Sequence, residues 1–270
     1  MRGHEVQNMS NIKAIVLDLD GTLLKKDGTV SKHIKKSLFN IMESGIKVFL
    51  ATGRPVSTSV PIHQELGLET PLICLNGALV FDRKAKKVLD YSPIPLNHVT
   101  TTKSKVINSA VAMICQTYRA NYEVINLIGK KIERNWPVEK PKGFPIIDEP
   151  VLKLKILFKD RESTELIYRE LEPLLQVSNW GSWFEVTAKN VSKWESIKKQ
   201  LEYFNINENE VMAFGDGMND LELLSNAGVG VVMENASPIV KEHANYSTLS
   251  NEEDGIAFFL NKFWSGNRIN

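Results

Sequence analysis

The sequence of 270 residues has little cysteine and no long hydrophobic runs. Its two cysteines, Cys74 and Cys115, lie singly within apolar stretches, so they have neither the paired spacing of a metal site nor that of a disulfide framework. Isolated cysteines of this kind are typical of small core residues in a reducing compartment. We therefore expect a cytoplasmic protein.

An excess of charge of either sign is also absent. The chain has 33 Lys and Arg against 32 Asp and Glu, and its formal net charge is +1. Neither nucleic acid nor a membrane surface is expected as a partner, because binding to either usually needs a basic excess. No apolar run reaches the roughly 20 residues of a membrane-spanning helix. Residues 1–11 are polar and lack a signal-peptide core, so we interpret them as a loose N-terminal extension.

Hydrophobic residues make up 43% of the chain, which is ample for a sizeable core. In residues 12–84 and 189–270, short apolar runs alternate with helical patterns. This alternation predicts a doubly wound, Rossmann-like parallel α/β sheet. Between the two segments, residues 85–188 change to a hairpin, separated strands and longer helices. The sequence therefore predicts a core domain that is interrupted by an inserted α+β domain.

Helical and strand patterns can be placed along the whole chain. The expected helices lie at residues 31–45, around Ile62 and Leu66, and at residues 99–118, 162–175, 192–204 and 256–263. The expected strands lie at residues 14–17, 46–51, 71–77, 122–128, 152–158, 180–187, 211–214 and 229–233, with a hairpin at residues 79–91.

The first apolar run, residues 14–17, stops at two carboxylates, Asp18 and Asp20. A short continuous apolar run is typical of a strand buried on both faces, and parallel sheets bind ligands beyond the carboxyl ends of their strands. A tight turn is the alternative, because Asp-Gly is also a hairpin dipeptide. A calcium loop is excluded, since Leu23 stands where its glycine belongs and Thr29 where its glutamate belongs.

Polar residues occupy the same kind of position at three further places. These are Thr52 with Gly53, Lys193, and Asp216 with Asn219 and Asp220. Carboxylates gathered at one sheet edge repel each other by about 4 kcal/mol per pair at ~4 Å and an effective dielectric near 20. A divalent cation relieves this repulsion, and a set of oxygen ligands favours Mg²⁺.

Each of these residues also has a purely structural interpretation. Thr52 with Gly53, and Asp216 with its glycine, fit simple turns. Asn219 has the spacing of a helix N-cap. Lys193 falls in a first helical turn, where a cation opposes the helix dipole by ~0.3–1 kcal/mol, so a solvated lysine is its default reading. A phosphate bound at that helix start would be stabilised both by the positive end of the helix dipole and by the ammonium group of Lys193.

Four segments resemble the motifs of the haloacid dehalogenase-like (HAD) superfamily, in the Cof-like group with a type IIB cap domain. In the family's order they are Asp18-Leu19-Asp20-Gly21-Thr22-Leu23-Leu24, Thr52-Gly53-Arg54, Lys193, and Gly215-Asp216-Gly217-Met218-Asn219-Asp220. The insertion between the second and third segments has a suitable length. An ordered set of four motifs is a specific signal, whereas one Asp-Gly pair is not.

The resemblance implies a Mg²⁺-dependent phosphatase of small phosphomonoesters such as sugar phosphates, nucleotides or phosphorylated cofactors. It implies that Asp18 attacks phosphorus to form an aspartyl-phosphate, and that Asp20 acts first as general acid and then as general base. The implied Mg²⁺ ligands are the Asp18 carboxylate, the Asp20 main-chain carbonyl and Asp216, with Asp220 supporting them. The implied phosphate contacts are the Leu19 backbone, Thr52, Gly53, Lys193 and Asn219.

Other functions and roles stay open at this point. A sugar phosphomutase would pass the phosphoryl group to a sugar hydroxyl instead of water. A non-catalytic phospholigand-binding protein is a third reading, although it has no use for an acid/base carboxylate at Asp20. The inserted domain is expected to act as a lid, and its Trp136, Trp180 and Trp183 either stack on a substrate ring or pack as core and strand-pair residues. A monomer or weak homodimer is expected.

The sequence departs from the family pattern at two positions. Trp194 stands where a small residue is usual after the motif lysine, and Glu234 replaces a usual glycine. Trp194 falls on one helical stripe with Ile197, Leu201 and Phe204, so we expect it in the core.

Overall fold

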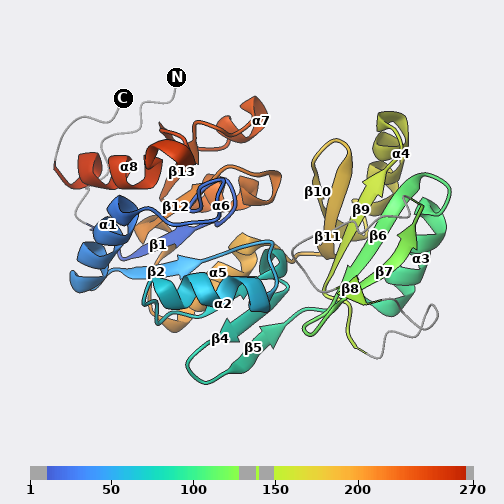
Figure 1. Cartoon of the computed structure of the whole chain (residues 1–270), viewed down its shortest axis with the longest axis horizontal. Helices are drawn as coiled ribbons and strands as arrows, with labels where there is room; N and C mark the ends of the chain where they lie inside the picture. Colours follow the sequence, from blue (N-terminus) through green and yellow to red (C-terminus); the bar gives the residue numbers. More distant parts are fainter. Residues whose placement is uncertain (1–10, 128–137, 140–148, 266–270) are drawn as a thin grey trace. The chain divides into compact units, whose positions relative to one another are not determined.

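The computed structural model describes residues 11–127, 138–139 and 149–265 (Figure 1). The chain divides into two compact units. The first comprises Met1–Thr52, Val60–Leu72 and Ile197–Asn270, and the second comprises Gly53–Ser59 and Ile73–Ser196. The domain boundaries expected from the sequence, after residues 84 and 188, stay a prediction. Residues 1–10 of the expected N-terminal extension lie outside the described part.

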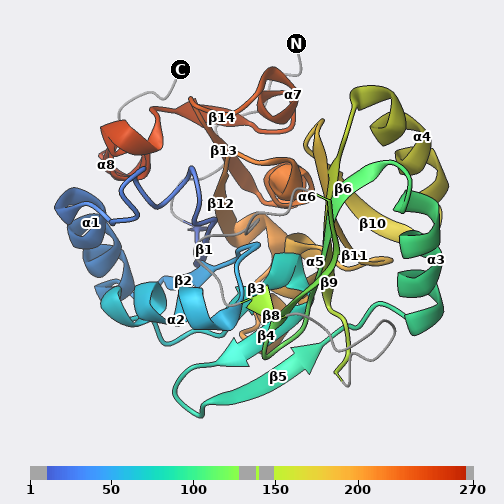
Figure 2. The ribbon, with the colours of Figure 1, turned by 45° about the vertical axis from the view of Figure 1, so that its right-hand side comes forward.

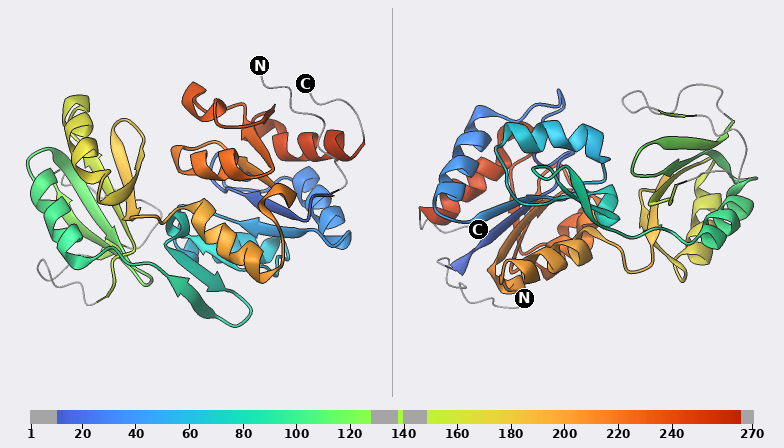
Figure 3. Two further views of the ribbon diagram at one scale, coloured as in Figure 1. Left: turned by 180° about the vertical axis from the view of Figure 1, so that it is seen from behind. Right: turned by 90° about the horizontal axis from the view of Figure 1, so that it is seen from below.

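The first unit is built on a five-stranded parallel sheet with the strand order β14-β13-β12-β1-β2. The strands are β1 (Ala14–Leu17), β2 (Lys47–Leu50), β12 (Val211–Gly215), β13 (Val229–Met233) and β14 (Tyr246–Thr248). Helices lie on both faces of the sheet (Figure 3). The doubly wound α/β fold predicted from the alternating pattern is therefore confirmed.

The helices of this unit are α1 (Lys32–Glu43), α6 (Leu221–Asn226), α7 (Pro238–Lys241) and α8 (Gly255–Trp264), while α2 (Val56–Glu65) and α5 (Lys193–Tyr203) have residues in both units. Helices α1, α2, α5 and α8 lie where the sequence predicts helices, whereas the short helices α6 and α7 were not predicted. In α1, the Ser31 side chain accepts a hydrogen bond from the Ile34 N–H at 3.1 Å, as its N-cap position predicts. Helices α1 and α8 pack side by side (Figures 1 and 2).

The second unit contains a six-stranded sheet with the order β10-β11-β9-β6-β7-β8. Its strands are β6 (Ala110–Gln116), β7 (Asn121–Asn126), β8 (Val138–Glu139), β9 (Lys153–Phe158), β10 (Leu175–Asn179) and β11 (Trp183–Ala188). Two helices, α3 (Leu96–Val106) and α4 (Arg161–Leu171), cover one face. A small sheet has the order β3-β4-β5, from β3 (Leu72–Cys74), β4 (Leu79–Asp82) and β5 (Lys87–Tyr91).

Short 3₁₀ turns connect several of these elements. They are η2 (Leu75–Gly77), η3 (Glu208–Glu210), η4 (Met218–Asp220) and η5 (Asn251–Glu253). η2 comes directly after β3, and η4 follows β12 after Asp216 and Gly217. Turns in this position hold polar side chains at the carboxyl ends of strands.

The helix predicted for residues 99–118 is wrong in its second half. Helix α3 ends at Val106, and residues 110–116 form β6 instead. This strand pairs on both sides, with β7 and with β9, and most of its residues are buried. A strand buried on both faces shows a continuous apolar run, which periodicity alone does not distinguish from a buried helix.

Other expectations in the second unit are partly met. The helix predicted for residues 162–175 ends at Leu171, and Leu175 begins β10. Trp180 and Trp183 stack on each other across the β10-β11 hairpin, with ring centroids 4.8 Å apart. Ile128 and Trp136 lie outside the described residues. Within the described part, every helix is too short or too polar to cross a bilayer.

The two cysteines are buried and unlinked, Cys74 in β3 and Cys115 in β6. Burial raises the pKa of each thiol from 9.0 to about 12. At pH 8 only roughly one thiol in ten thousand should be ionised in the folded protein, and the thiolate is the reactive form. We expect native protein to resist a disulfide-exchange reagent at pH 8, and protein in guanidinium to react at both thiols. Fast native labelling would contradict this.

The same shift has a consequence for stability at high pH. Below the unfolded thiol pKa of 9.0, both the folded and the unfolded chain keep the thiol protons, and the free energy of unfolding is at its full value. As the pH rises from 9.0 through the folded pKa of about 12, the unfolded chain loses these protons first, so the free energy of unfolding falls. Denaturant midpoints measured between pH 8 and pH 10 should therefore fall, and replacing both cysteines with alanine should reduce that slope.

Candidate active site

The candidate site lies at the carboxyl ends of three adjacent strands. β1 pairs with β2 on one side and with β12 on the other. Just past the strands, the Asp18 N–H donates to the Phe214 carbonyl at 3.1 Å and the Ala51 N–H to the Leu17 carbonyl at 3.0 Å. The hydrogen bonds between the strands therefore extend to Asp18 itself and to Ala51, the residue before Thr52. They fix the backbone of Asp18 beside the neighbouring strand ends.

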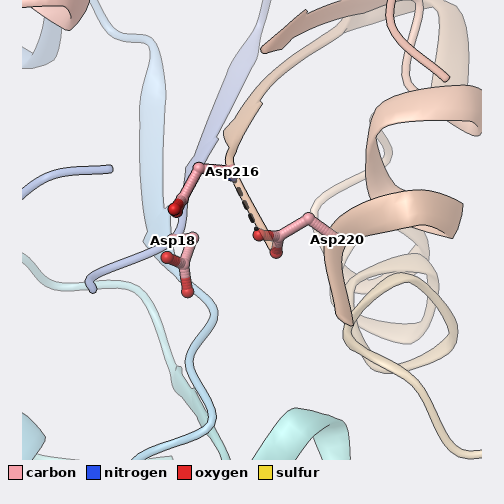
Figure 4. A group of neighbouring side chains, drawn as sticks. All are labelled: Asp18, Asp216 and Asp220. Atoms are coloured by element: carbon pink, nitrogen blue, oxygen red, sulfur yellow. Dashed lines mark hydrogen bonds between the residues drawn. The ribbon is translucent and has the colours of Figure 1, made fainter. Parts of the chain in front are cut away.

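Three carboxylates meet at this edge, as Figure 4 shows. Asp18, Asp216 and Asp220 each offer an oxygen atom, and these atoms lie within 4.8 Å of one another. Asp18 is 5% exposed and Asp220 is fully buried. Buried like charges at this separation are costly unless a cation neutralises them. The donor set consists of oxygen atoms, so it fits a hard divalent ion such as Mg²⁺.

Asp220 also anchors the loop that carries Asp216. Its Oδ2 accepts hydrogen bonds from the backbone N–H groups of Asp216 at 3.2 Å and Gly217 at 2.9 Å. A Cβ atom on Gly215 would lie 2.6 Å from the Asp220 Cβ, so only glycine allows this close approach. Asn219 lies within the η4 turn, and α6 begins after Asp220 without a side-chain cap. The N-cap reading of Asn219 is therefore wrong.

Two residues that the sequence did not single out orient Asp216. Thr22 Oγ1 donates to Asp216 Oδ1 at 2.8 Å, and Asn235 Nδ2 lies 3.2 Å from Asp216 Oδ2. The same Asn235 amide donates to the Gly21 carbonyl at 2.9 Å. Asn235 follows β13, so its place after another parallel strand was the available sequence signal.

The loop after β1 approaches Asp216 closely. Gly21 has a φ of +82°, and a Cβ atom there would lie 2.2 Å from Asp216 Oδ2. Leu19 is fully buried, whereas Asp20 is exposed. Among the described residues, the group of converging carboxylates does not include the Asp20 side chain. That is compatible with the earlier expectation, which assigned only the main-chain carbonyl of Asp20 to the metal.

The remaining predicted residues are distributed between the two units. Thr52, fully buried, belongs to the first unit, and Gly53 and Lys193 belong to the second. Lys193 is fully buried at the first position of α5, so the reading as a solvated lysine is wrong. Ser192 Oγ accepts the Glu195 N–H at 3.2 Å, so Ser192 caps the start of this helix.

The core stripe predicted for α5 is confirmed at three of its four positions, while Phe204, just past the end of the helix, is only half-buried. Trp194, Ile197 and Leu201 are 3%, 0% and 1% exposed. The unusual tryptophan after the motif lysine therefore packs as a core residue.

Comparisons with known proteins show which family the chain belongs to. Residues 15–260 match a family model described as haloacid dehalogenase-like hydrolase. The 5-amino-6-(5-phospho-D-ribitylamino)uracil phosphatase YitU of Bacillus subtilis is 29% identical over 262 residues, covering 93% of this chain and 97% of that protein. The pyridoxal phosphate phosphatase YbhA of Escherichia coli is 29% identical over 266 residues, covering 92% and 97% respectively.

Solved structures give the same result. A sugar phosphatase of HAD subclass IIB aligns with a TM-score of 0.81 and 26% identity, over 93% of this chain and 99% of that one. A haloacid dehalogenase-like hydrolase from Bacteroides thetaiotaomicron aligns with a TM-score of 0.76 at 26% identity, over 93% and 99%.

The family model that matches residues 15–260 describes a hydrolase, and the matched relatives are phosphatases. The chain belongs to the haloacid dehalogenase-like hydrolase family, in the Cof-like group of subclass IIB. It is a phosphoric monoester hydrolase.

Proposed function

We propose that this protein is a Mg²⁺-dependent phosphatase of small phosphomonoesters that works through an aspartyl-phosphate. The observation that carries the proposal is the approach of Asp18, Asp216 and Asp220 to within 4.8 Å of one another. One carboxylate of such a cluster can attack phosphorus while the others help to hold a cation. Bound Mg²⁺ would neutralise charge on the carboxylates and on the phosphoryl oxygens.

Asp18 is the proposed nucleophile. Its carboxylate oxygen forms a bond to phosphorus as the bond between phosphorus and the leaving oxygen breaks, and Asp20 gives that oxygen a proton. Asp20 then takes a proton from a water molecule, which attacks the acyl phosphate and releases inorganic phosphate and free Asp18. Covalent catalysis divides one difficult displacement into two easier ones. The exposure of Asp20 supports a role in exchanging protons with substrate and water.

Phosphate contacts are proposed for five residues: the Leu19 backbone, Thr52, Gly53, Lys193 and Asn219. Phosphate-monoester hydrolysis needs accelerations of up to ~10²¹-fold, so positioned donors and positive charge are required as well as a nucleophile. The complete burial of Lys193 supports this role, because an ammonium group removed from water interacts strongly with an anion.

The proposed substrates are small, soluble phosphate esters. The relatives carry names of phosphatases for a ribitylamino-uracil phosphate, for pyridoxal phosphate and for a sugar phosphate. These compounds share a phosphomonoester on a compact polar molecule, and this shared chemistry is what we assign to the site. The near-neutral net charge supports a small molecule over a nucleic acid. The two buried free thiols support the cytoplasm as the proposed location.

A phosphate-ester panel tests the proposal. We expect purified protein with Mg²⁺ to release phosphate from p-nitrophenyl phosphate and, faster, from some of a set of sugar phosphates, nucleotides and phosphorylated cofactors. Excess EDTA should stop the release, and added Mg²⁺ should restore it. Isomerised hexose phosphate without free phosphate would indicate a phosphomutase instead. Thermal stabilisation by a phosphate ester without any turnover would indicate a binding protein.

A further inference from the structure

A buried ion pair lies in the second unit, on the strands of its six-stranded sheet. Lys153 of β9 and Glu185 of β11 are joined at 2.7 Å between Nζ and Oε1. The Lys153 side chain is fully buried and that of Glu185 is 8% exposed. Along β11, Phe184 and Val186 point into the apolar core beneath α3 and α4. Because side chains alternate along a strand, Glu185 projects from the opposite face.

The pair contacts the backbone of the second motif. Lys153 Nζ donates to the Gly53 carbonyl at 2.8 Å. On the other side of the pair, Asn76 Nδ2 donates to Glu185 Oε2 at 2.8 Å. The residue before Asn76 contacts the next carbonyl of the motif, because the Leu75 N–H donates to the Arg54 carbonyl at 3.1 Å. Two successive carbonyls of the motif, those of Gly53 and Arg54, are therefore held by this unit.

Gly53 is also enclosed by this network. A Cβ atom at Gly53 would lie 2.9 Å from Asn76 Oδ1, 3.4 Å from Lys153 Nζ and 3.5 Å from Glu185 Oε2. The space that a side chain would need is thus occupied by the polar groups of the network. This is the physical reason for a glycine in the second motif.

The turn that carries Asn76 reaches the third motif as well. Asn76 is buried in a left-handed conformation, with a φ of 58°, inside η2. The next residue, Gly77, accepts a hydrogen bond from Ser196 Oγ at 2.6 Å. A Cβ atom on Gly77 would lie 2.1 Å from the Ser192 carbonyl. The turn is therefore packed against the first turn of α5, where Lys193 lies.

The energetics of the pair point to a role beyond stability. Burial raises the pKa of Glu185, but the charge and hydrogen bond of Lys153, together with the Asn76 hydrogen bond, outweigh it, so the pKa lies below its ordinary value. Apolar residues of similar volume often stabilise a protein as well as a buried ion pair or better. The contacts that the pair makes with the Gly53 carbonyl and with Asn76 point to a role in holding these groups in place.

We propose that Lys153 and Glu185 are positioning residues that fix the phosphate-binding turn at Gly53, and that Asn76 and Gly77 extend the same network to the helix start at Lys193. The inference rests on the proposed function, because Gly53 and Lys193 are proposed phosphate contacts. The ion pair thereby sets the backbone that receives the phosphoryl group and does not contact the rest of the substrate.

The test replaces both charges together, Lys153→Met with Glu185→Met, because a single change would leave one buried charge without its partner. The matched control is Lys105→Met with Glu170→Met, which removes a surface pair of the same unit joined at 2.6 Å. We expect kcat/KM for p-nitrophenyl phosphate to fall about 10- to 100-fold, the range seen when outer partners of a site are removed. The inhibition constant of inorganic phosphate should rise about tenfold, and the control should change neither.

A readout independent of catalysis follows the backbone directly. In protein labelled with ¹⁵N-glycine, the Gly53 amide should exchange with solvent faster in the double variant than in the wild type and the control. If melting temperature alone falls, with phosphate inhibition and the Gly53 amide unchanged, the pair is structural and the inference is overturned. If KM changes only for large substrates, the pair contacts the leaving group and the inference is also overturned.

The failure of the proposed function would look different. It would appear as wild-type protein that hydrolyses nothing in the phosphate-ester panel. In that case the affinity for inorganic phosphate and the exchange rate of the Gly53 amide, each compared between the double variant and the wild type, would still test the positioning role. Unchanged phosphate affinity and amide exchange in the double variant would overturn it.

Discussion

Asp18→Asn is expected to lower phosphate release by at least about 10⁴-fold, the scale on which enzymes lose activity when a covalent nucleophile is removed. Asparagine has nearly the same shape, but its amide oxygen carries no negative charge and does not form a stable phosphoryl intermediate. The substitution also removes one of three crowded carboxylates, so the melting temperature without Mg²⁺ should not fall. Release from p-nitrophenyl phosphate and thermal unfolding with and without Mg²⁺ measure the two effects.

The control for this substitution is Asp27→Asn. Asp27 lies in an exposed turn, where its side chain accepts hydrogen bonds from the N–H and hydroxyl groups of Thr29. Turnover and stabilisation by Mg²⁺ should stay at wild-type levels in this variant. Turnover above about a hundredth of wild type in Asp18→Asn would show that another group attacks phosphorus.

Gly21→Ala is expected to abolish most activity by displacing a different carboxylate. The new Cβ would lie 2.2 Å from Asp216 Oδ2, so Asp216 must move away from the position that Thr22 and Asn235 give it. The left-handed backbone at a φ of +82° adds about 1–2 kcal/mol of strain for a residue with a side chain. We expect kcat/KM to fall by about 10²-fold or more and the apparent affinity for Mg²⁺ to fall with it.

Gly28→Ala is the control that separates the effect of backbone strain from the effect of the close contact with Asp216. Gly28 has nearly the same φ, +81°, but nothing lies within 4 Å of its missing Cβ. This variant should lose a similar amount of stability through its backbone while keeping its activity and its Mg²⁺ affinity. If Gly21→Ala kept wild-type Mg²⁺ affinity, or if Gly28→Ala lost it, the close contact with Asp216 would not be the cause.

Much of the first unit could be predicted because its local signals agree with one another. The run at residues 14–17 is wholly apolar, it is followed by polar residues, and in the structure it forms the buried strand β1. The same reasoning found the end of β12, so Asp18 and Asp216 were predicted to meet. Parallel strands make such predictions dependable, because all their carboxyl ends lie at one edge of the sheet.

The features that were missed depend on tertiary contacts. The place of Asn235 after β13 puts it near the strand ends, but only the structure shows that its amide reaches both Gly21 and Asp216. Lys153 lies in an alternating strand pattern, in which a lysine is normally expected to face solvent. In the structure it is fully buried and paired with Glu185, 32 positions away. In the same way, only strand pairing separates β6 from a buried helix.

The place of β1 in its sheet also has a consequence for biosynthesis. β1 is the first strand of the described chain, but one of its two partners is β12 at Val211–Gly215. The strands of the six-stranded sheet are all complete by Ala188. A nascent chain interrupted before residue 216 therefore holds Asp18 without Asp216, and it cannot gather the three carboxylates. The ribosome synthesises Asp18 first, then Asp216, and Asp220 last. A nascent chain that ends before Asp220 therefore lacks the complete group of three carboxylates.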